Sequence, residues 1–355
     1  MKSLLRGAVS IFCLSLSGIF YGQSTPTASL LVLSKQDHTL SIVDASNLQV
    51  VAKVPVGNDP HEVIASSDGS TAYVSNYGFG AFHTLAVVDI VGHKALPAID
   101  LGPLHGPHGL AFAGGKTWFT AEAAKAIGRY DPATNKVDWI LGTGQNRTHM
   151  IYVSPDLQRI VTTNVNSGTV SIIDQEPVPM PGPPPGMHPP SGGAGMPPRP
   201  LPGARPRMDW NETVVRVGNG SEGFDVSPDG KEIWVANAGD GTISVIDFGG
   251  KKVVQTIAAN VPGANRLKFT PDGKRVLVSA GPELVVFDSA SRSEVKRLQI
   301  GHGSGGVLIQ PDGRRAFVAC GPDNYVAVID LQSLEITGHI EAGREPDGMA
   351  WAVRH

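Results

Sequence analysis

The stretch SEGFDVSPDGKEIWVANAGDGTISVIDFGGKKVVQTI, residues 221–257, contains four short β-rich runs separated by turn residues. The runs are GFDVS, EIWVAN, TISVID and KVVQTI. The first turn, Pro-Asp-Gly, has a physical basis, because Pro presets φ near about −65°, Asp bonds back to the backbone and Gly accepts a positive φ. Four such runs within about 40 residues are typical of one four-stranded propeller blade.

Further copies of this unit follow one another along the chain. Each copy ends its third run with an aspartate, as in SIVD, AVVD, VSIID, SVID, VVFD and AVID, with GRYD as a degenerate member. These aspartates are Asp44, Asp89, Asp131, Asp174, Asp247, Asp288 and Asp330. Their spacing is 41–45 residues except for one gap of 73 residues. A period of about 40 to 50 residues predicts a β-propeller.

The number of blades follows from the first run of each copy. These runs start near residues 60, 107, 148, 221, 264, 304 and 346. The last copy stops after EPDGMAWAV, and the three runs that it lacks lie at residues 29–56. The sequence therefore predicts an all-β, seven-bladed propeller of four-stranded antiparallel blades. Its last blade is closed by N- and C-terminal strands, which hides the open sheet edges.

The gap of 73 residues is explained by an insertion in the third blade, over residues 175–211. Thirteen of the 28 prolines lie from Pro177 to Pro206. Proline lacks an amide donor and glycine costs entropy, so this segment is expected to be mobile and polyproline-like. It is either a tolerated loop insertion or a docking arm whose methionines could bind a soft metal.

The N-terminal residues 1–24 have the features of a signal peptide. Lys2 and Arg6 precede an apolar segment, Ala8 to Phe20, that is short for a membrane span. We therefore expect a mature propeller over residues 25–355 that is periplasmic or extracellular, monomeric and without a transmembrane span. An uncleaved signal anchor and a lipid anchor at Cys13 are the alternatives.

Several blades resemble the YVTN-type β-propeller repeat. The resemblance rests on TAYVSN (71–76), EIWVAN (232–237), GTVSIID (168–174) and GTISVID (241–247), and it covers nearly all of the expected mature chain. It implies the propeller fold and an exported bacterial protein, with relatives among surface-layer proteins. Similar propellers occur in lactonases, streptogramin lyases and the haem d1 domain of nitrite reductase. Function must therefore be argued from the site.

One position of the repeat carries chemistry on several blades. The first residues of each inner run should border the mouth of the central channel. The equivalent position is occupied by His61, His108, His149, Glu222, Asn265, Gly305 and Asp347. Loops of the same face add three arginines, Arg147, Arg266 and Arg344. We expect these histidines, arginines and carboxylates to lie together on one face.

The residue types at this mouth allow more than one chemistry. Imidazoles of His61, His108 and His149 could bind a divalent metal, Zn or Cu, or act as general acid and base. Arginines beside them suit a carboxylate or phosphate. The alternative is structural, since a Pro-His-Gly turn can use its histidine simply to cap the turn.

The leading functional hypothesis is an exported binding module whose His/Arg-rich face takes a small anionic ligand, a metal or an envelope protein partner. The alternative is a lactonase- or lyase-type enzyme with a metal or a histidine acid–base pair at the channel mouth. A formal net charge of −3 disfavours a nucleic-acid partner. The sequence contains no C-x-x-C-H motif, which excludes covalent c-type haem.

Overall fold

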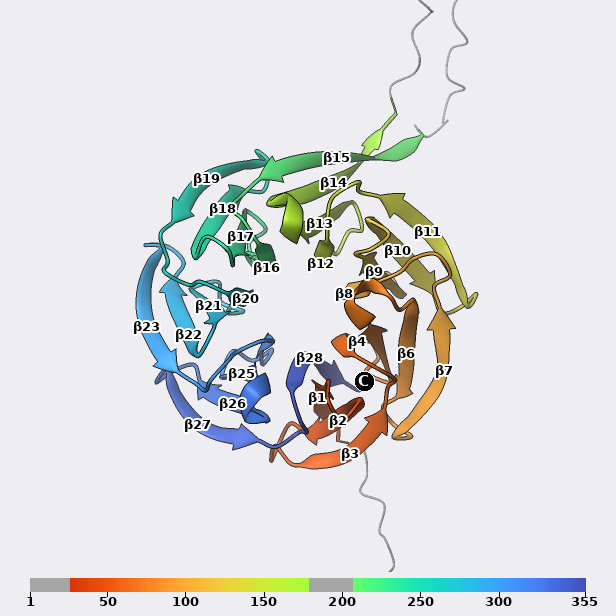
Figure 1. Ribbon diagram of the computed structural model, residues 1–355, viewed down its shortest axis with the longest axis vertical. Helices are drawn as coiled ribbons and strands as arrows, with labels where there is room; N and C mark the ends of the chain where they lie inside the picture. The colour runs from red at the N-terminus through yellow and green to blue at the C-terminus, as the bar shows by residue number, and fades with distance from the viewer. Residues whose placement is uncertain (1–25, 179–206) are drawn as a thin grey trace, which may run out of the picture.

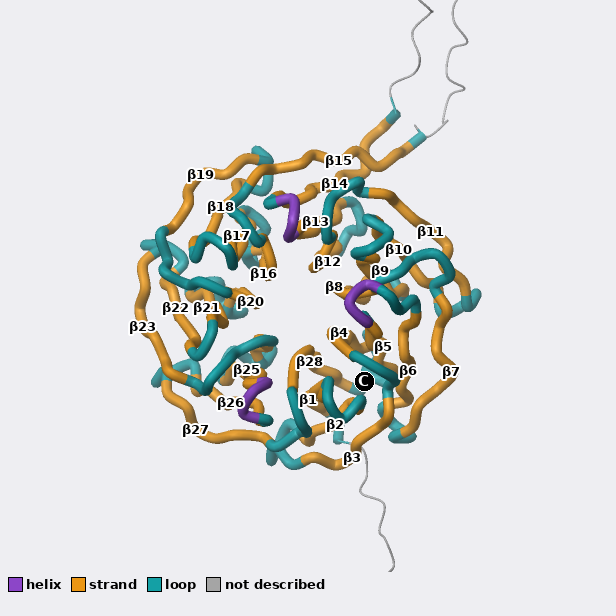
Figure 2. The backbone as a smooth tube through the Cα atoms, viewed as in Figure 1, coloured by secondary structure: helices purple, strands orange, loops and turns teal. Residues whose placement is uncertain are grey.

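Each repeat of the sequence forms one four-stranded antiparallel sheet. The computed structural model describes residues 26–178 and 207–355. Within them, seven such sheets surround a central channel (Figures 1 and 2). The seven-bladed prediction is confirmed. We number the blades 1 to 7 in the chain order of their inner strands.

The strands of each blade succeed one another from the channel outward. The inner strands are β4 (Pro60–Ala65), β8 (Pro107–Ala113), β12 (Thr148–Val153), β16 (Ser221–Val226), β20 (Ala264–Phe269), β24 (Val307–Ile309) and β28 (Pro346–Val353). The second strands are β5 (Thr71–Asn76), β9 (Lys116–Ala121), β13 (Arg159–Asn164), β17 (Glu232–Asn237), β21 (Arg275–Ala280), β25 (Arg315–Cys320) and β1 (Ala28–Ser34). The third strands are β6 (Thr84–Asp89), β10 (Ala126–Asp131), β14 (Thr169–Pro177), β18 (Thr242–Asp247), β22 (Glu283–Asp288), β26 (Tyr325–Asp330) and β2 (Thr39–Asp44).

The outer strands complete the blades. They are β7 (Lys94–Asp100), β11 (Lys136–Gly142), β15 (Met208–Arg216), β19 (Lys252–Ile257), β23 (Ser293–Gln299), β27 (Glu335–Ile340) and β3 (Val50–Pro55). Three short 3-10 helices, η1 (Gly78–Gly80), η2 (Val165–Ser167) and η3 (Gly321–Asp323), follow second strands.

Blade 7 joins the two ends of the described chain. Its strand order is β28-β1-β2-β3, and β28 pairs with β1 in an antiparallel register that places Leu30 opposite Trp351. The predicted closure by N- and C-terminal strands is therefore confirmed.

The hydrophobic core lies between neighbouring blades. Second and third strands are covered on both faces, so their apolar runs are almost continuous. Between blades 4 and 5, for example, the Trp234 and Phe269 rings meet edge to face with centroids 5.7 Å apart. Because each blade packs its apolar faces against its two neighbours, the ring is complete only when every blade is present.

The ends of the predicted insertion differ from expectation. Strand β14 extends to Pro177 and β15 begins at Met208, and Gln175 pairs with Trp210 across the two strands. Cross-strand pairing therefore includes residues 175–177 and 208–211, at the two ends of the expected insertion. The centre of that segment (179–206) and the predicted signal peptide (1–24) lie outside the described residues. In the part of the chain that is described, no helix has the length and apolarity to cross a membrane.

Deleting residues 345–355 should lower the unfolding temperature strongly. The deletion removes β28, so the buried amide and carbonyl groups of β1 lose their partners, each at a cost of about 1–3 kcal/mol. Thermal unfolding followed by circular dichroism measures the effect, with deletion of the exposed His355 alone as the control. An unchanged transition in the longer deletion would contradict the role of β28 in closing the ring.

Candidate functional site

A cavity of about 870 Å³ opens at the mouth of the channel. The second position of every inner run lines it. These residues are His61, His108, His149, Glu222, Asn265, Gly305 and Asp347. The repeat thus brings seven residues from distant parts of the chain round one space.

A β-bulge directs these positions toward the channel. In blade 1, Pro60 pairs with Asn76 and Val63 with Val74, so that His61 and Glu62 both lie opposite Ser75. The same shift of register occurs near the start of β8, β12, β16 and β20. A bulge changes the direction of side chains and leaves backbone groups unpaired in the ladder.

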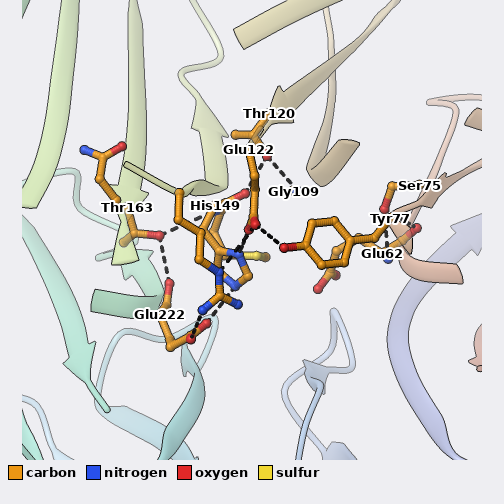
Figure 3. A network of polar contacts seen from close by, with 12 residues as sticks. Glu62, Ser75, Tyr77, Gly109, Thr120, Glu122, His149, Thr163 and Glu222 are labelled. Carbon is orange, nitrogen blue, oxygen red and sulfur yellow. Dashed lines mark hydrogen bonds and ion pairs between the residues drawn. The ribbon is translucent and has the colours of Figure 1, made fainter. Parts of the chain in front are cut away.

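A hydroxyl side chain satisfies the bulge and ties it to the next blade. We call this arrangement the hydroxyl clamp; it uses the fifth residue of the second strand, namely Thr120, Thr163 and Ser279, whereas the equivalent Ser75 bonds to the amide and carbonyl of Glu62 within its own blade. The Thr120 hydroxyl accepts from the Gly109 amide at 2.9 Å and donates to the His149 carbonyl of blade 3 at 2.5 Å (Figure 3). Thr163 joins blade 3 to the Glu222 carbonyl of blade 4 at 2.8 Å.

His149 lies between two carboxylates and is 2% exposed. Its Nδ1–H donates to Oε1 of Glu122, and its Nε2 is 2.8 Å from Oε2 of Glu222, at ion-pair distance but without hydrogen-bond geometry (Figure 3). Burial opposes protonation of this ring, but the two carboxylates outweigh burial and raise the pKa of His149. The imidazole therefore holds a proton more readily than a free histidine does.

His108 packs against His149 and has the opposite electrostatic environment. The ring centroids are 3.9 Å apart, and His108 is also 2% exposed. Burial and the neighbouring positive charges, first that of His149 and then that of Arg266, lower the pKa of His108 well below its usual range. Its Nδ1 is buried and has no hydrogen-bond partner among residues 26–178 and 207–355. This ring is therefore neutral, with a buried nitrogen that an additional group could satisfy.

Glu122 connects three other groups of the site. The Tyr77 hydroxyl donates to its Oε2 at 2.5 Å, and Arg147 lies 3.4 Å from the same oxygen and 3.1 Å from Oε1 of Glu222 (Figure 3). Burial raises the pKa of Tyr77 far above its usual value, and the hydrogen bond to Glu122 adds to this effect. Burial of Glu222 is outweighed by His149 and Arg147, which lower its pKa to about 2.

Three of these residues form a possible metal-ligand group. Among the described residues, His108, His149 and Glu122 each offer a ligand atom, and these atoms lie within 4.8 Å of one another. Two imidazoles and one carboxylate are the protein ligands of many catalytic zinc sites. The predicted set of His61, His108 and His149 is not the set that the structure brings together. The His61 ring lies 5.2 Å from that of His108, and its Nδ1 is 3.3 Å from the Asp59 carbonyl oxygen.

The cations at the cavity already have carboxylate partners. Arg266 of blade 5 pairs with Glu62 of blade 1, across the channel, and both side chains are buried. Lys35 is 3.2 Å from Asp347, and Arg147 is shared by two glutamates as described above. Arg147, Arg266 and Lys35 are therefore each paired with a carboxylate at the channel mouth.

Arg344 was expected near the cavity, and the structure corrects this. Its Nε donates to Oδ1 of Asp37 at 2.6 Å, and its side chain is 60% exposed. It lines a separate groove with Tyr325 and His339, not the channel mouth. The loop is on the expected face, but a nearby aspartate holds the side chain away from the channel.

Sequence analysis missed Glu122 and Tyr77. Each follows the last residue of a second strand, and Lys35 has the same position in blade 7. Alignment of the residue after each second run would have placed these three side chains on the channel-mouth face. The equivalent positions of the other blades hold apolar or small residues, so this position of the repeat does not stand out as polar in the sequence.

Comparisons with known proteins support the fold. No protein-family model matches this chain, and no curated protein matches it in sequence. A protein of unknown function from Desulfotomaculum acetoxidans has a TM-score of 0.70 at 15% identity, covering 92% of this chain and 99% of that one. A putative 6-phosphogluconolactonase from Bacteroides uniformis has a TM-score of 0.68 at 15% identity, with coverage of 92% and 99%. The dihydro-heme d1 dehydrogenase NirN in complex with DHE has a TM-score of 0.61 at 16% identity, with coverage of 92% and 75%. At these identities the likeness shows a shared propeller fold alone.

Replacing Thr120 by valine should destabilise the protein by about 1–3 kcal/mol. The substitution keeps the shape but leaves the Gly109 amide and the His149 carbonyl without their buried hydroxyl partner. Urea unfolding measures the loss. Thr337→Val is the matched control, because Thr337 is exposed and water can replace its bond to the Val328 carbonyl; its effect should stay within about 0.5 kcal/mol. Equal effects of the two variants would contradict the structural role of the clamp.

Removing one partner of the Arg266–Glu62 ion pair should destabilise the protein more than removing both partners. Arg266→Met leaves Glu62 buried without its partner, which typically costs about 3–5 kcal/mol. The double variant Arg266→Met/Glu62→Leu should be more stable than Arg266→Met, because it removes both charges. A double-mutant cycle by urea unfolding tests this, and additive losses would show that the two side chains do not interact.

Proposed function

We propose that this chain is an exported propeller of the YVTN type that binds a divalent transition metal, Zn²⁺ or Cu²⁺, at its channel mouth. His108, His149 and Glu122 are the proposed ligands. One observation carries the proposal: the buried Nδ1 of His108 has no hydrogen-bond partner among the described residues, although a second imidazole and a carboxylate lie beside it.

The environment of His108 suits a metal ion. A buried polar atom without a partner is costly, and native structures rarely leave one. Because the ring is neutral, its lone pair is available to a cation. Binding would require His149 to give up the proton that it shares with Glu122, since ligands coordinate in their deprotonated form.

A bound metal would also supply a net positive charge for a small anionic ligand, which the paired arginines do not supply. A divalent ion with one carboxylate ligand keeps a net positive charge, whereas Arg147 and Arg266 are already neutralised. The cavity of about 870 Å³ gives a ligand access to the proposed ligands His108 and His149, which line it. The small anionic ligand of the binding-module hypothesis is therefore proposed to bind through this ion.

A lactonase- or lyase-type enzyme is the second candidate for the same site. It is favoured by the position of Tyr77, a hydroxyl that is not among the proposed metal ligands, on the wall of the cavity. A metal with an open coordination position could polarise a carbonyl group there. Turnover of a panel of lactones by the metal-loaded protein would separate this candidate from simple binding.

Isothermal titration of the tag-free protein, dialysed against a chelator, should show one Zn²⁺ or Cu²⁺ ion per chain. His108→Ala and Glu122→Gln should each weaken binding by about 100-fold or more, because each removes a ligand. Titrations in buffers of different ionisation enthalpy should also reveal proton release.

His302→Ala is the matched control, because His302 is an 88% exposed histidine outside the proposed ligand set. Its affinity for the metal should not change. Circular dichroism establishes that each variant is folded. Absence of binding by the wild-type protein, or unchanged affinity in a folded Glu122→Gln variant, would refute the proposed metal site.

A further inference from the structure

His149 contacts a different carboxylate through each of its ring nitrogens. Its Nδ1–H donates to Oε1 of Glu122 in blade 2, and its Nε2 is 2.8 Å from Oε2 of Glu222 in blade 4 (Figure 3). Nε2 is buried and has no hydrogen-bond partner among the described residues, so the Glu222 carboxylate beside it is the acceptor toward which an Nε2–H can turn. The two nitrogens of this ring are therefore not equivalent.

A metal ion would find its other ligands on the Glu122 side of the ring. Candidate ligand atoms of His108, His149 and Glu122 lie within 4.8 Å of one another, and within the described part of the chain Glu222 belongs to no such group. The buried nitrogen of His108 that lacks a partner is its Nδ1. Oε2 of Glu122 accepts from Tyr77 at 2.5 Å, whereas Oε1 is the oxygen that contacts His149. Nδ1 of His149 is therefore the nitrogen that faces the proposed ligands.

Coordination through one nitrogen leaves the proton of a neutral imidazole on the other nitrogen. Metal-binding histidines commonly donate this second N–H to a carboxylate, which fixes the orientation of the ring and makes it a stronger ligand. A carboxylate suits this role because, when ionised, it only accepts hydrogen bonds. With Nδ1 of His149 on the ion, the Nε2–H faces Oε2 of Glu222.

Glu222 is itself held in place at two points. The Arg147 guanidinium donates to its Oε1 at 3.1 Å, and the Thr163 hydroxyl donates to its backbone carbonyl at 2.8 Å. Oε2 is therefore left for His149. Because the carbonyl makes the bond to Thr163, a substitution of the Glu222 side chain leaves the hydroxyl clamp intact.

We propose that Glu222 is a positioning residue of the channel-mouth site: its carboxylate accepts the Nε2–H of His149 and thereby presents Nδ1 of this ring to the metal. The ion then takes Nδ1 from both His108 and His149 and a carboxylate oxygen from Glu122, while Glu222 stays outside the ligand set. In assigning donor atoms to a metal site, the inference rests on the proposed function. Blade 4 thus orients a ligand that belongs to blade 3.

Calorimetric titration of the full chain with Zn²⁺ tests this role. Glu222→Met removes the acceptor and keeps a side chain of similar length. It should weaken Zn²⁺ binding by about 10-fold to 100-fold, as is typical when the carboxylate behind a ligating histidine is lost. Glu222→Gln keeps an oxygen acceptor at the same reach, so it should bind Zn²⁺ more tightly than Glu222→Met does.

Loss of a negative charge near a cation would also weaken binding, so a charge-matched variant is required. Arg147→Met/Glu222→Met has the same net charge as the wild-type protein, yet His149 still lacks its acceptor. We expect this double variant to bind Zn²⁺ at least about tenfold more weakly than the wild-type protein. Equal affinity of the two would show that Glu222 acts through charge alone, which would overturn the positioning role.

Glu345→Gln is the matched single control. Glu345 also lines the cavity, but it pairs with Lys35 at 3.7 Å and its side chain is 51% exposed. Because exposed charges are screened, its effect on Zn²⁺ affinity should stay within about twofold. A loss as large as that of Glu222→Met would contradict a specific role for Glu222.

The position of the ring proton gives a readout that a purely structural residue would not change. Long-range proton–nitrogen correlation spectra of the zinc-loaded full chain distinguish a coordinated ring nitrogen from a protonated one. We expect His149 to show a metal-bound Nδ1 and a protonated Nε2. Coordination of His149 through Nε2 would overturn the inference, and this measurement on the wild-type protein decides it even where a Glu222 variant does not fold.

The wild-type titration comes first, so the two failures can be told apart. If the wild-type protein binds Zn²⁺ and a Glu222→Met variant that circular dichroism shows to be folded binds it equally well, Glu222 has no positioning role and the metal site stands. If the wild-type protein binds neither Zn²⁺ nor Cu²⁺, the proposed function fails and the positioning role fails with it.

Discussion

The hydroxyl clamp is the interaction on which the arrangement of the channel mouth depends. A β-bulge alone would turn side chains toward the channel but would leave an amide unpaired. Thr120 and Thr163 resolve this by accepting from that amide and donating to the inner strand of the next blade. The same hydroxyl therefore stabilises the bulge and fixes the distance between neighbouring blades. His149 and Glu222 occupy their positions because their own carbonyl groups are held in this way.

Several charges of the site are balanced between blades, whereas Lys35 and Asp347 both belong to blade 7. Arg266 of blade 5 meets Glu62 of blade 1, and His149 of blade 3 meets Glu122 of blade 2 and Glu222 of blade 4. Buried charges are tolerated only when they are paired. His149 meets carboxylates of the two adjacent blades, whereas the Arg266–Glu62 pair joins blades 5 and 1 and therefore depends on the arrangement of the whole ring.

The comparisons illustrate why fold alone does not assign an activity. Proteins as different as a putative 6-phosphogluconolactonase and a dihydro-heme d1 dehydrogenase share this fold at 15% to 16% identity. Local features point to a site in this chain: an imidazole nitrogen on His108 without a partner among the described residues, and the carboxylate of Glu122 beside it. These features support the proposed metal site, which can be tested without reference to any relative.

The repeat period, the turn residues and the incomplete last copy determined the number of blades and the way the ring closes. They could do so because equivalent positions of a repeat occupy equivalent places in a pseudo-symmetric ring. The same logic placed His108 and His149 at the channel mouth. It could not reveal that both rings are buried or that Glu122, and not His61, joins them in the possible metal-ligand group. Nor could it reveal that Asp37 holds the Arg344 side chain away from the channel. Those outcomes depend on which side chains of different blades reach one another. Only the tertiary structure decides such distances, because burial and pairing across the channel arise when the seventh blade closes the ring.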